Sequence, residues 1–329
     1  MTKNKKEPVL SVVMPVFNTE RFVAQAIESI LAQTFTDFEF IIVDDGSTDK
    51  TFEVISSFAD ERIIIEQFPK NKGFITSLEH GIHKARGKWI ARMDADDISS
   101  PNRFAVEIEF LNNHPNCVFI GTTYHILSPA GKILNKLINP SSGWKLLNKE
   151  LLTSGKRKFA DPTTIFNREQ AINVGLYDHD IRYEAPLWYK LLVVGDGVEL
   201  YKPLHLYRIQ LDSNTNKPRK EPRTVMYKNT RKRYDPNNAK NYIHWDESNW
   251  LKPKDMRVLN IIKAMRMCHI TGDRQTAWEI FKKILPEFRF DPILLKILIK
   301  GVLGVKNLSP FTHRHPEKYE EIKLDWYPF

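Results

Sequence analysis

Cysteine is scarce in this chain of 329 residues. It has two, Cys117 and Cys268, which lie far apart and without the spacing of a metal site. The sequence therefore argues against a disulfide framework and against a thiolate zinc site. A reducing compartment such as the cytoplasm fits this scarcity.

Long apolar runs are also missing. No uninterrupted apolar stretch reaches the roughly 20 residues that a membrane-spanning helix needs. Residues 1–8 are polar and basic, and the apolar run that follows is too short for the core of a signal peptide. We therefore expect a cytoplasmic globular protein, since 42% hydrophobic and 27% charged residues are ordinary values for that class.

Acidic residues are outnumbered, with 40 Asp and Glu against 49 Lys and Arg and a net charge of +9. This balance favours anionic partners such as a nucleotide, an acidic membrane surface or nucleic acid. Residues 217–233 hold eight basic residues and one acidic residue, with Pro218 and Pro222 among them, and predict a basic linker. Because only Tyr227 in this run and Tyr234 directly after it supply aromatic rings, we expect no nucleic-acid partner.

Strand and helix patterns alternate over the first hundred residues. The apolar runs predict strands over 10–17, 38–43, 62–66 and 88–93, and helical spacing predicts helices over 20–33, 51–58 and 74–85. Asn18 and Thr19 are expected to form a turn that caps the first helix. Strands joined by crossover helices predict a parallel sheet covered on both faces, with ligands bound beyond the carboxyl ends of the strands.

Three carboxylates gather where one of these strands ends. Asp94, Asp96 and Asp97 directly follow the apolar run 89–93. Like charges this close disfavour each other's ionisation unless a cation compensates, and Mg²⁺ takes carboxylate and phosphate oxygens as ligands. The pattern predicts a metal-bound, phosphorylated substrate. The alternative is an Asp-rich turn that only caps the next helix.

Four motifs together resemble the family-2 glycosyltransferases of the GT-A fold, over residues 9 to about 211. In chain order they are Met14-Pro15-Val16-Phe17-Asn18, Val43-Asp44-Asp45-Gly46-Ser47-Thr48-Asp49, Asn71-Lys72-Gly73 and Asp94-Ala95-Asp96-Asp97. The resemblance implies an α/β fold, with a Rossmann-like, mostly parallel sheet flanked by helices. A C-terminal helical region is expected to follow it.

The resemblance also implies roles for single residues. Asp45 would contact the base of a nucleotide, and Asp94 would bind on the sugar side. Asp96 and Asp97 would hold Mn²⁺ or Mg²⁺ on the diphosphate. The implied donor-binding residues are Pro15, Phe17, Asn18, Asp45, Lys72 and Asp94. A tight turn with a helix cap is the simpler structural explanation of Asp44, Gly46 and Ser47.

Further landmarks lie downstream. Residues 159–166 look like the family's acceptor-side strand, with Asp161 where members often have His, and 174–178 look like its Gly-x-Tyr-Asp turn. Aligned on Leu187-Trp188, Glu184 takes the place of the catalytic base. Its alternative role is to stabilise the start of a helix predicted over 186–194. Arg208, near the end of the domain, is expected to be exposed; the alternative is that it approaches the diphosphate.

The chemistry that this resemblance implies needs a cation and a base. A divalent ion stabilises the diphosphate that leaves the anomeric carbon, and Glu184 would take the proton of the attacking hydroxyl, with inversion. The expected function is an inverting glycosyltransferase that uses a nucleoside-diphosphate sugar, preferably a UDP-sugar. The expected acceptor is a glycan or lipid-linked glycan precursor of the capsule or lipopolysaccharide type.

Two other functions stay open. A sugar-phosphate nucleotidyltransferase would normally carry a Gly-rich phosphate loop after its first strand, and residues 14–18 contain no glycine. A non-catalytic nucleotide-sugar-binding protein is conceivable, because Asp161 and the pair Tyr183-Glu184 depart from the family pattern.

The expected domains are a glycosyltransferase domain, a linker and a helical region. The first covers 1–211, with a nucleotide-sugar half (1–98) and an acceptor half (99–211); the linker covers 212–253, and the helical region 254–329. An αα-hairpin is predicted from 256–270 and 274–285. A further apolar helix over 292–305 either belongs to a small bundle or lies in an anionic membrane surface, which would place the protein peripherally on the inner face.

Overall fold

A computed structural model describes residues 7–128, 131–136, 143–148, 159–179, 185–210, 233, 274–288, 319–322 and 324–326. The chain forms two compact units. The first comprises residues 1–124, 140–206 and 226–243, and the second comprises 125–139, 207–225 and 244–329.

The first unit begins with the alternation that the sequence predicts. Its strands are β1 (Leu10–Val16), β2 (Phe38–Asp44), β3 (Ile63–Gln67) and β4 (Trp89–Arg92), and its helices are α1 (Val23–Leu31), α2 (Thr51–Ser56) and α3 (Phe74–Lys84). All seven predicted elements are present. The predicted cap of the first helix is wrong, because α1 starts at Val23 without a side-chain cap and the Asn18 side chain accepts a hydrogen bond from Thr48 instead.

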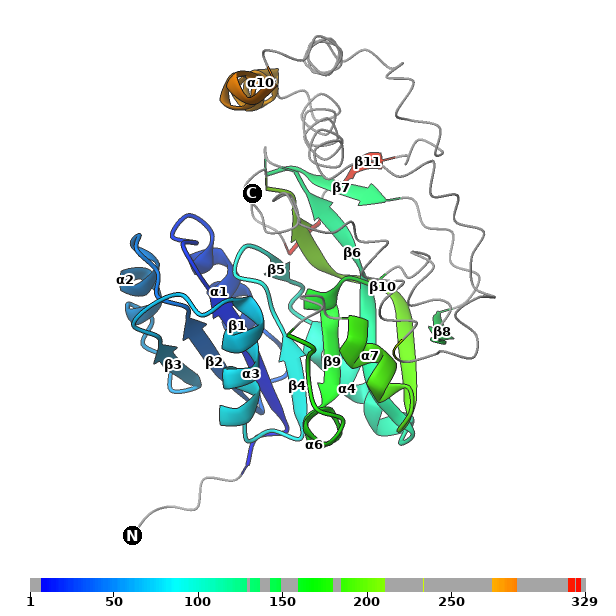
Figure 1. Ribbon diagram of the computed structural model, residues 1–329. Coiled ribbons are helices and arrows are strands. Elements are labelled where there is room, and N and C mark those ends of the chain that lie inside the picture. Colours follow the sequence, from blue (N-terminus) through cyan, green and yellow to red (C-terminus); the bar gives the residue numbers. More distant parts are fainter. Residues whose placement is uncertain are drawn as a thin grey trace. The chain divides into compact units, whose positions relative to one another are not determined.

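The strands form a mixed sheet whose centre is parallel (Figure 1). β1 pairs in parallel with both β2 and β4, and β2 pairs in parallel with β3. On the other side of β4, β9 (Thr164–Asn167) runs antiparallel to β4 and to β6 (Cys117–Leu127). The order in this unit is therefore β6-β9-β4-β1-β2-β3. The carboxyl ends of β1, β2 and β4 meet at one edge.

Helices cover both faces of this sheet, as expected. Alternate strand residues enter two separate hydrophobic cores because successive side chains of a strand point to opposite faces. One core joins Val13, Ile41 and Val43 to Leu78 and Ile82 of α3. The other joins the neighbouring strand residues to α1 and to the helix α4 (Arg103–Asn113); among its members are Val12, Met14, Phe40, Ile42, Ile27, Ile30, Phe104 and Ile108.

The rest of the first unit surrounds a buried tryptophan. Its elements are β5 (Ile98–Ser99), β8 (Trp144–Leu146), the 3-10 helix η1 (Asp161–Thr163), α6 (Arg168–Asn173), α7 (Ala185–Leu191) and most of β10 (Asp196–Arg208). Trp188 of α7 packs against the rings of Phe119 and Phe166, at centroid distances of 5.1 and 5.7 Å. The indole Nε1 donates to Asp161 Oδ1 over 2.8 Å.

Three details differ from the sequence-based expectation. The strand predicted over 159–166 begins as η1, since Pro162 lacks the N–H that a strand ladder uses, and only then becomes β9. The helix predicted over 186–194 ends at Leu191. Arg208 is 9% exposed, so the expectation of an exposed arginine is wrong; it closes the long strand β10 as a buried residue.

The described part of the second unit is small. The end of β6 pairs with β7 (Ile133–Lys136), which pairs antiparallel with β11 (Tyr319–Ile322). The helix α10 (Arg274–Phe288) corresponds to the second predicted helix of the hairpin. The helices predicted over 256–270 and 292–305, and the linker apart from Arg233, lie outside the described residues. Within the described ranges, no helix combines the length and the apolar character that crossing a bilayer requires.

We expect Gly46→Ala to destabilise the first unit by more than about 2 kcal/mol. Gly46 has a φ of +72°, and an added Cβ would lie 2.6 Å from the backbone carbon of Lys70. Gly175→Ala is the matched control, because Gly175 has a φ of +83° but open space around it. The control should lose only the roughly 1–2 kcal/mol of the left-handed conformation. Urea unfolding measures both, and equal losses would contradict the predicted clash.

Candidate functional site

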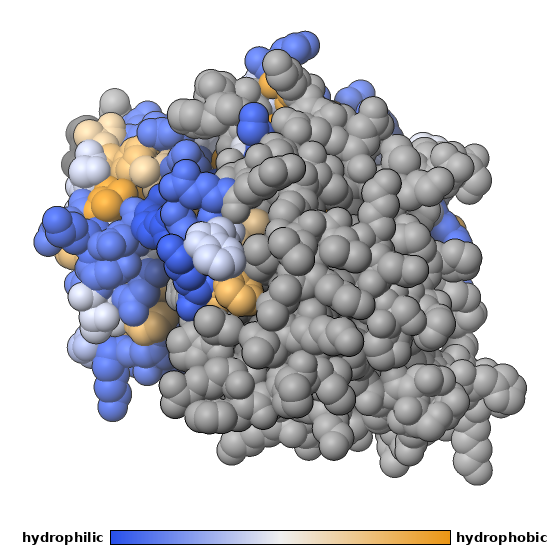
Figure 2. Space-filling view, turned by 90° about the horizontal axis from the view of Figure 1, so that it is seen from above, coloured by the Kyte–Doolittle hydropathy of each residue, from blue (hydrophilic) through white to orange (hydrophobic). Residues whose placement is uncertain are grey.

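Polar turns follow β1, β2 and β4 at the carboxyl edge of the parallel strands, which is the upper edge of the sheet in Figure 1. Figure 2 views the molecule from the side to which these strands point. The described residues visible there are mainly hydrophilic, with small separate hydrophobic areas. This edge is where an open parallel sheet binds its ligands.

The turns after β1 and β2 are joined by hydrogen bonds. The backbone N–H of Asn18 donates to Ser47 Oγ over 3.1 Å, and the N–H of Thr48 donates to Asn18 Oδ1 over 2.8 Å. Asn18 has a φ of +52°, a left-handed conformation that Asn tolerates better than most residues. Phe17, beside it, is 40% exposed, whereas Pro15 is buried within β1. Of the donor-binding residues predicted on this strand and its turn, Phe17 therefore offers an accessible ring.

Asp45 connects the turn after β2 to the start of α3. Its two carboxylate oxygens accept the backbone N–H groups of Lys72 and Gly73, over 2.7 and 2.9 Å. Gly73 directly precedes α3, so the carboxylate stabilises the beginning of that helix. Asp44 accepts the N–H of Ser47 within the same turn, over 3.1 Å, as the simpler structural reading of that turn expects.

The two remaining donor-binding candidates, Lys72 and Asp94, lie in different loops of this edge. Lys72 follows β3, and its Nζ lies 4.0 Å from the centre of the Phe68 ring, a cation–π contact. Asp94 lies after β4, in the loop that leads to β5.

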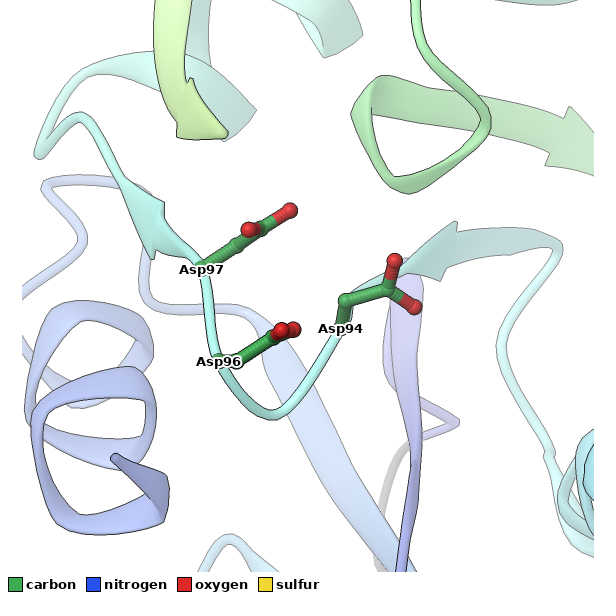
Figure 3. A group of neighbouring side chains, drawn as sticks. All are labelled: Asp94, Asp96 and Asp97. Atoms are coloured by element: carbon green, nitrogen blue, oxygen red, sulfur yellow. The ribbon is translucent and has the colours of Figure 1, made fainter. Parts of the chain in front are cut away.

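Asp94 belongs to a cluster with the two predicted metal ligands, Asp96 and Asp97. One oxygen from each of the three carboxylates lies within 4.8 Å of the others. Figure 3 shows that all three side chains come from the single loop between β4 and β5. Such a set of close carboxylate oxygens is the donor chemistry that Mg²⁺ and Mn²⁺ prefer.

The charges around the cluster also fit a cation. The pKa of Asp94 is raised to about 7, mainly by burial and also by the carboxylates of Asp97 and Asp96. Arg92 opposes this shift, with its Nη2 atom 3.1 Å from Asp94 Oδ1. Carboxylates this close disfavour each other's ionisation, and a divalent cation bound among them would relieve that repulsion.

Sequence reasoning missed a histidine at this cluster. His205 Nε2 lies 2.8 Å from Asp97 Oδ2, and both side chains are buried. Burial lowers the pKa of His205 well below 6.5, and Arg103 and Arg92 lower it further. The ring is therefore neutral at neutral pH and donates its Nε2–H to the carboxylate. No local sequence pattern predicts this contact, because His205 and Asp97 are 108 residues apart.

A second buried group lies behind β4. Arg103 and Glu107 form an ion pair of 2.9 Å on α4, and neither side chain is exposed. Arg103 also donates to the carbonyl oxygen of Arg92 over 3.2 Å. Burial raises the pKa of Glu107 to about 7, although Arg103 opposes the shift. The spacing of four residues and the charged Arg92 inside an apolar run are signals that sequence reasoning could have used.

The predicted base, Glu184, lies outside the described residues, directly before Ala185, the first residue of α7. Two other carboxylates, Asp161 and Asp178, compete with it as candidates for the base. Asp161 accepts from the Trp188 indole, and Asp178 pairs with Lys190 Nζ at 2.8 Å. Asp178 also pairs with Arg233 at 3.1 Å. Both competitors are thus held by partners of their own.

Relatives in sequence cover the same region. The family model described as glycosyl transferase family 2 matches residues 11–174. EpsE of Bacillus subtilis is 40% identical over 118 residues, which are 35% of this chain and 42% of EpsE. An uncharacterized glycosyltransferase of Rickettsia typhi is 28% identical over 227 residues, which are 66% of this chain and 69% of that protein. The chain thus spans less than half the length of EpsE.

Solved structures show the same fold. The crystal structure of S. aureus TarS 1-349 in complex with UDP-GlcNAc is similar to this chain, with a TM-score of 0.54 and 13% sequence identity. The similarity covers 90% of this chain and 88% of that one. A longer S. aureus TarS structure gives the same score at 14% identity, over 88% of this chain and 54% of that one. The fold is therefore GT-A, as expected. With its motifs, its sheet and its relatives in agreement, the chain belongs to glycosyl transferase family 2.

Proposed function

We propose that this protein is an inverting, metal-dependent glycosyltransferase that moves a sugar from a nucleoside-diphosphate sugar to a hydroxyl group. The observation that carries the proposal is the convergence of Asp94, Asp96 and Asp97 at the carboxyl edge of the sheet, where such sheets bind ligands. Family membership supports the reaction class. The preferred donor is a UDP-sugar, since the similar fold of S. aureus TarS has been crystallised with UDP-GlcNAc.

The donor-binding residues divide into a nucleotide side and a sugar side. Phe17 and Asn18 border the turn of Asp45, which would contact the base, and Lys72 lies two residues before the start of α3. Both oxygens of Asp45 accept backbone hydrogen bonds and the residue is 2% exposed, so its main effect on a bound nucleotide would be to hold the turn in place. Asp94 faces the diphosphate and sugar from the other side.

Asp96 and Asp97 would hold Mn²⁺ or Mg²⁺, with Asp94 close enough to share the ion. When bound, the metal supplies a Lewis acid for the charge that develops on the leaving diphosphate. The protein's part is to keep three carboxylates in one loop at the strand end, so that the diphosphate is oriented for departure.

Glu184 is the proposed general base. It directly precedes α7, and Trp188 fixes that helix to Asp161 and to the aromatic core. A carboxylate in this place would take the proton of the acceptor hydroxyl on the face opposite the diphosphate, which gives inversion.

The proposed acceptor is a glycan or lipid-linked glycan precursor of a cell-surface polymer, of the capsule or lipopolysaccharide type. We also propose the division into a domain over 1–211, a basic linker over 212–253 and a helical region over 254–329. The basic linker would bring the protein to the inner face of an anionic membrane, where lipid-linked acceptors are found.

A non-catalytic sugar-nucleotide-binding protein is the second candidate, favoured by the engagement of Asp161 with Trp188 at a position where members often carry His. One assay separates the two. Release of nucleoside diphosphate across a panel of donors, with Mn²⁺ and with a chelator, should show one donor consumed in a metal-dependent way. Donor binding without any release would support the second candidate.

Asp96→Ala should lower transfer by about 10²- to 10³-fold or more, since it removes a metal ligand. The fold should persist, because Asp96 lies in a loop at the strand end and is partly exposed. Calorimetry of Mn²⁺ binding and a melting curve measure the two effects. Glu53→Ala is the control, since Glu53 is an exposed carboxylate on α2 away from the cluster. Unchanged metal-dependent donor binding in Asp96→Ala would refute the assignment.

Glu184→Gln should lower the turnover rate by about 10²- to 10⁴-fold and leave donor affinity nearly unchanged, because it removes basicity and keeps shape. Asp161→Asn is the comparison variant: its amide oxygen still accepts from Trp188, and its turnover should stay near normal. The reverse result, with turnover lost in Asp161→Asn and kept in Glu184→Gln, would move the base to Asp161.

Binding to anionic membranes should depend on salt, because each basic residue near the surface contributes about 1 kcal/mol. Flotation with vesicles that contain an anionic lipid should recover the protein at low ionic strength and lose it at high ionic strength. Neutral vesicles are the control. Equal recovery with both lipids, or none with either, would argue against the proposed location.

A further inference from the structure

His205 is a buried histidine that nothing in the proposed reaction yet uses. It lies on β10, which pairs antiparallel with β5, so that His205 stands opposite Ser99 and Leu206 opposite Ile98. β5 follows Asp97 directly in the chain. The backbone pairing of these two strands therefore fixes the end of the loop 93–97, which carries the three carboxylates and is called the metal loop below. His205 adds a side-chain contact to Asp97, the last carboxylate of that loop.

That contact is short and lies out of reach of water. Nε2 of His205 is 2.8 Å from Oδ2 of Asp97, and the two side chains are 0% and 1% exposed. A buried carboxylate keeps one orientation only if donors hold it. One carboxylate oxygen of Asp97 lies within 4.8 Å of oxygens of Asp94 and Asp96, so a contact that fixes this carboxylate also fixes its place in the cluster.

The surroundings of the other ring nitrogen, Nδ1, indicate that the contact with Asp97 is the reason why this position holds a histidine. Nδ1 of His205 is buried and has no hydrogen-bond partner among the described residues. A buried polar atom without a partner costs free energy that an apolar ring of similar size would avoid. Filling space alone would therefore favour Phe or Leu on β10, whereas donating a hydrogen bond to Asp97 requires the imidazole.

We propose that His205 is a positioning residue, which holds the Asp97 carboxylate so that one oxygen faces Asp94 and Asp96 in the arrangement that receives the divalent cation. This inference rests on the proposed metal site. The hydrogen-bond partners of metal ligands typically change metal affinity by about 10- to 100-fold when they are lost.

Two substitutions separate the hydrogen bond from the packing. His205→Phe keeps a ring of similar volume and removes the donor. His205→Gln places an amide N–H near the position of Nε2 and restores it. We expect His205→Phe to weaken Mn²⁺ binding by about 10- to 100-fold, and His205→Gln to recover most of that loss. The measurement is calorimetry of Mn²⁺ with UDP present at a fixed concentration, together with melting curves without metal; His205→Met replaces the Phe variant if that one does not fold.

A double-mutant cycle with Asp97→Ala tests whether His205 acts through Asp97. If it does, adding His205→Phe to Asp97→Ala should cause little further loss of Mn²⁺ affinity. Equal and additive losses in the two backgrounds would overturn the inference, and so would wild-type affinity in His205→Phe or an equal defect in the Phe and Gln variants.

The wild-type protein distinguishes this inference from the proposed function. Metal binding by wild type with no effect of His205→Phe removes the role of His205 and leaves the metal site standing. A wild-type protein that binds no Mn²⁺ with UDP removes both the metal site and the role of His205.

Discussion

The repulsion among three carboxylates at the end of β4 is the constraint around which this edge of the molecule is arranged. Asp94, Asp96 and Asp97 stay together because their surroundings oppose the repulsion at separate points. Arg92 pairs with Asp94, and His205 donates to Asp97. Behind them Arg103 holds the backbone of β4 through the carbonyl of Arg92. The parallel sheet, buried on both faces, supplies the rigid platform that this costly arrangement needs.

Local patterns predicted the parallel half of the fold because β1, β2 and β4 are buried on both faces and therefore appear as continuous apolar runs. The four strands and three helices of residues 10–92 were found this way, and the polar turns that follow the strands were placed at one edge. The same reasoning failed where a partner distant in the sequence determines which hydrogen bond a side chain makes. Asn18 was expected to cap α1, but its side chain bonds to Thr48 in the next turn, 30 residues away.

The candidate site likewise contains residues that local sequence patterns predicted and residues that they did not. The carboxylates of the metal loop are visible in the sequence because they are adjacent and follow a strand. His205 was not, because a single histidine in an apolar strand has no local signature, and only the antiparallel pairing of β10 with β5 brings it to Asp97. Arg208 was misjudged for a related reason: burial of a charged residue depends on the long strand around it and not on its own type.

Asp45 has a consequence for anyone who would redesign the nucleotide preference of this protein. Its carboxylate joins the turn after β2 to the two residues that precede α3, through the N–H groups of Lys72 and Gly73. A substitution at this position changes the folding of that helix start along with any contact to a base. Phe17, with an accessible ring and no such backbone duty, is the better place to begin such engineering.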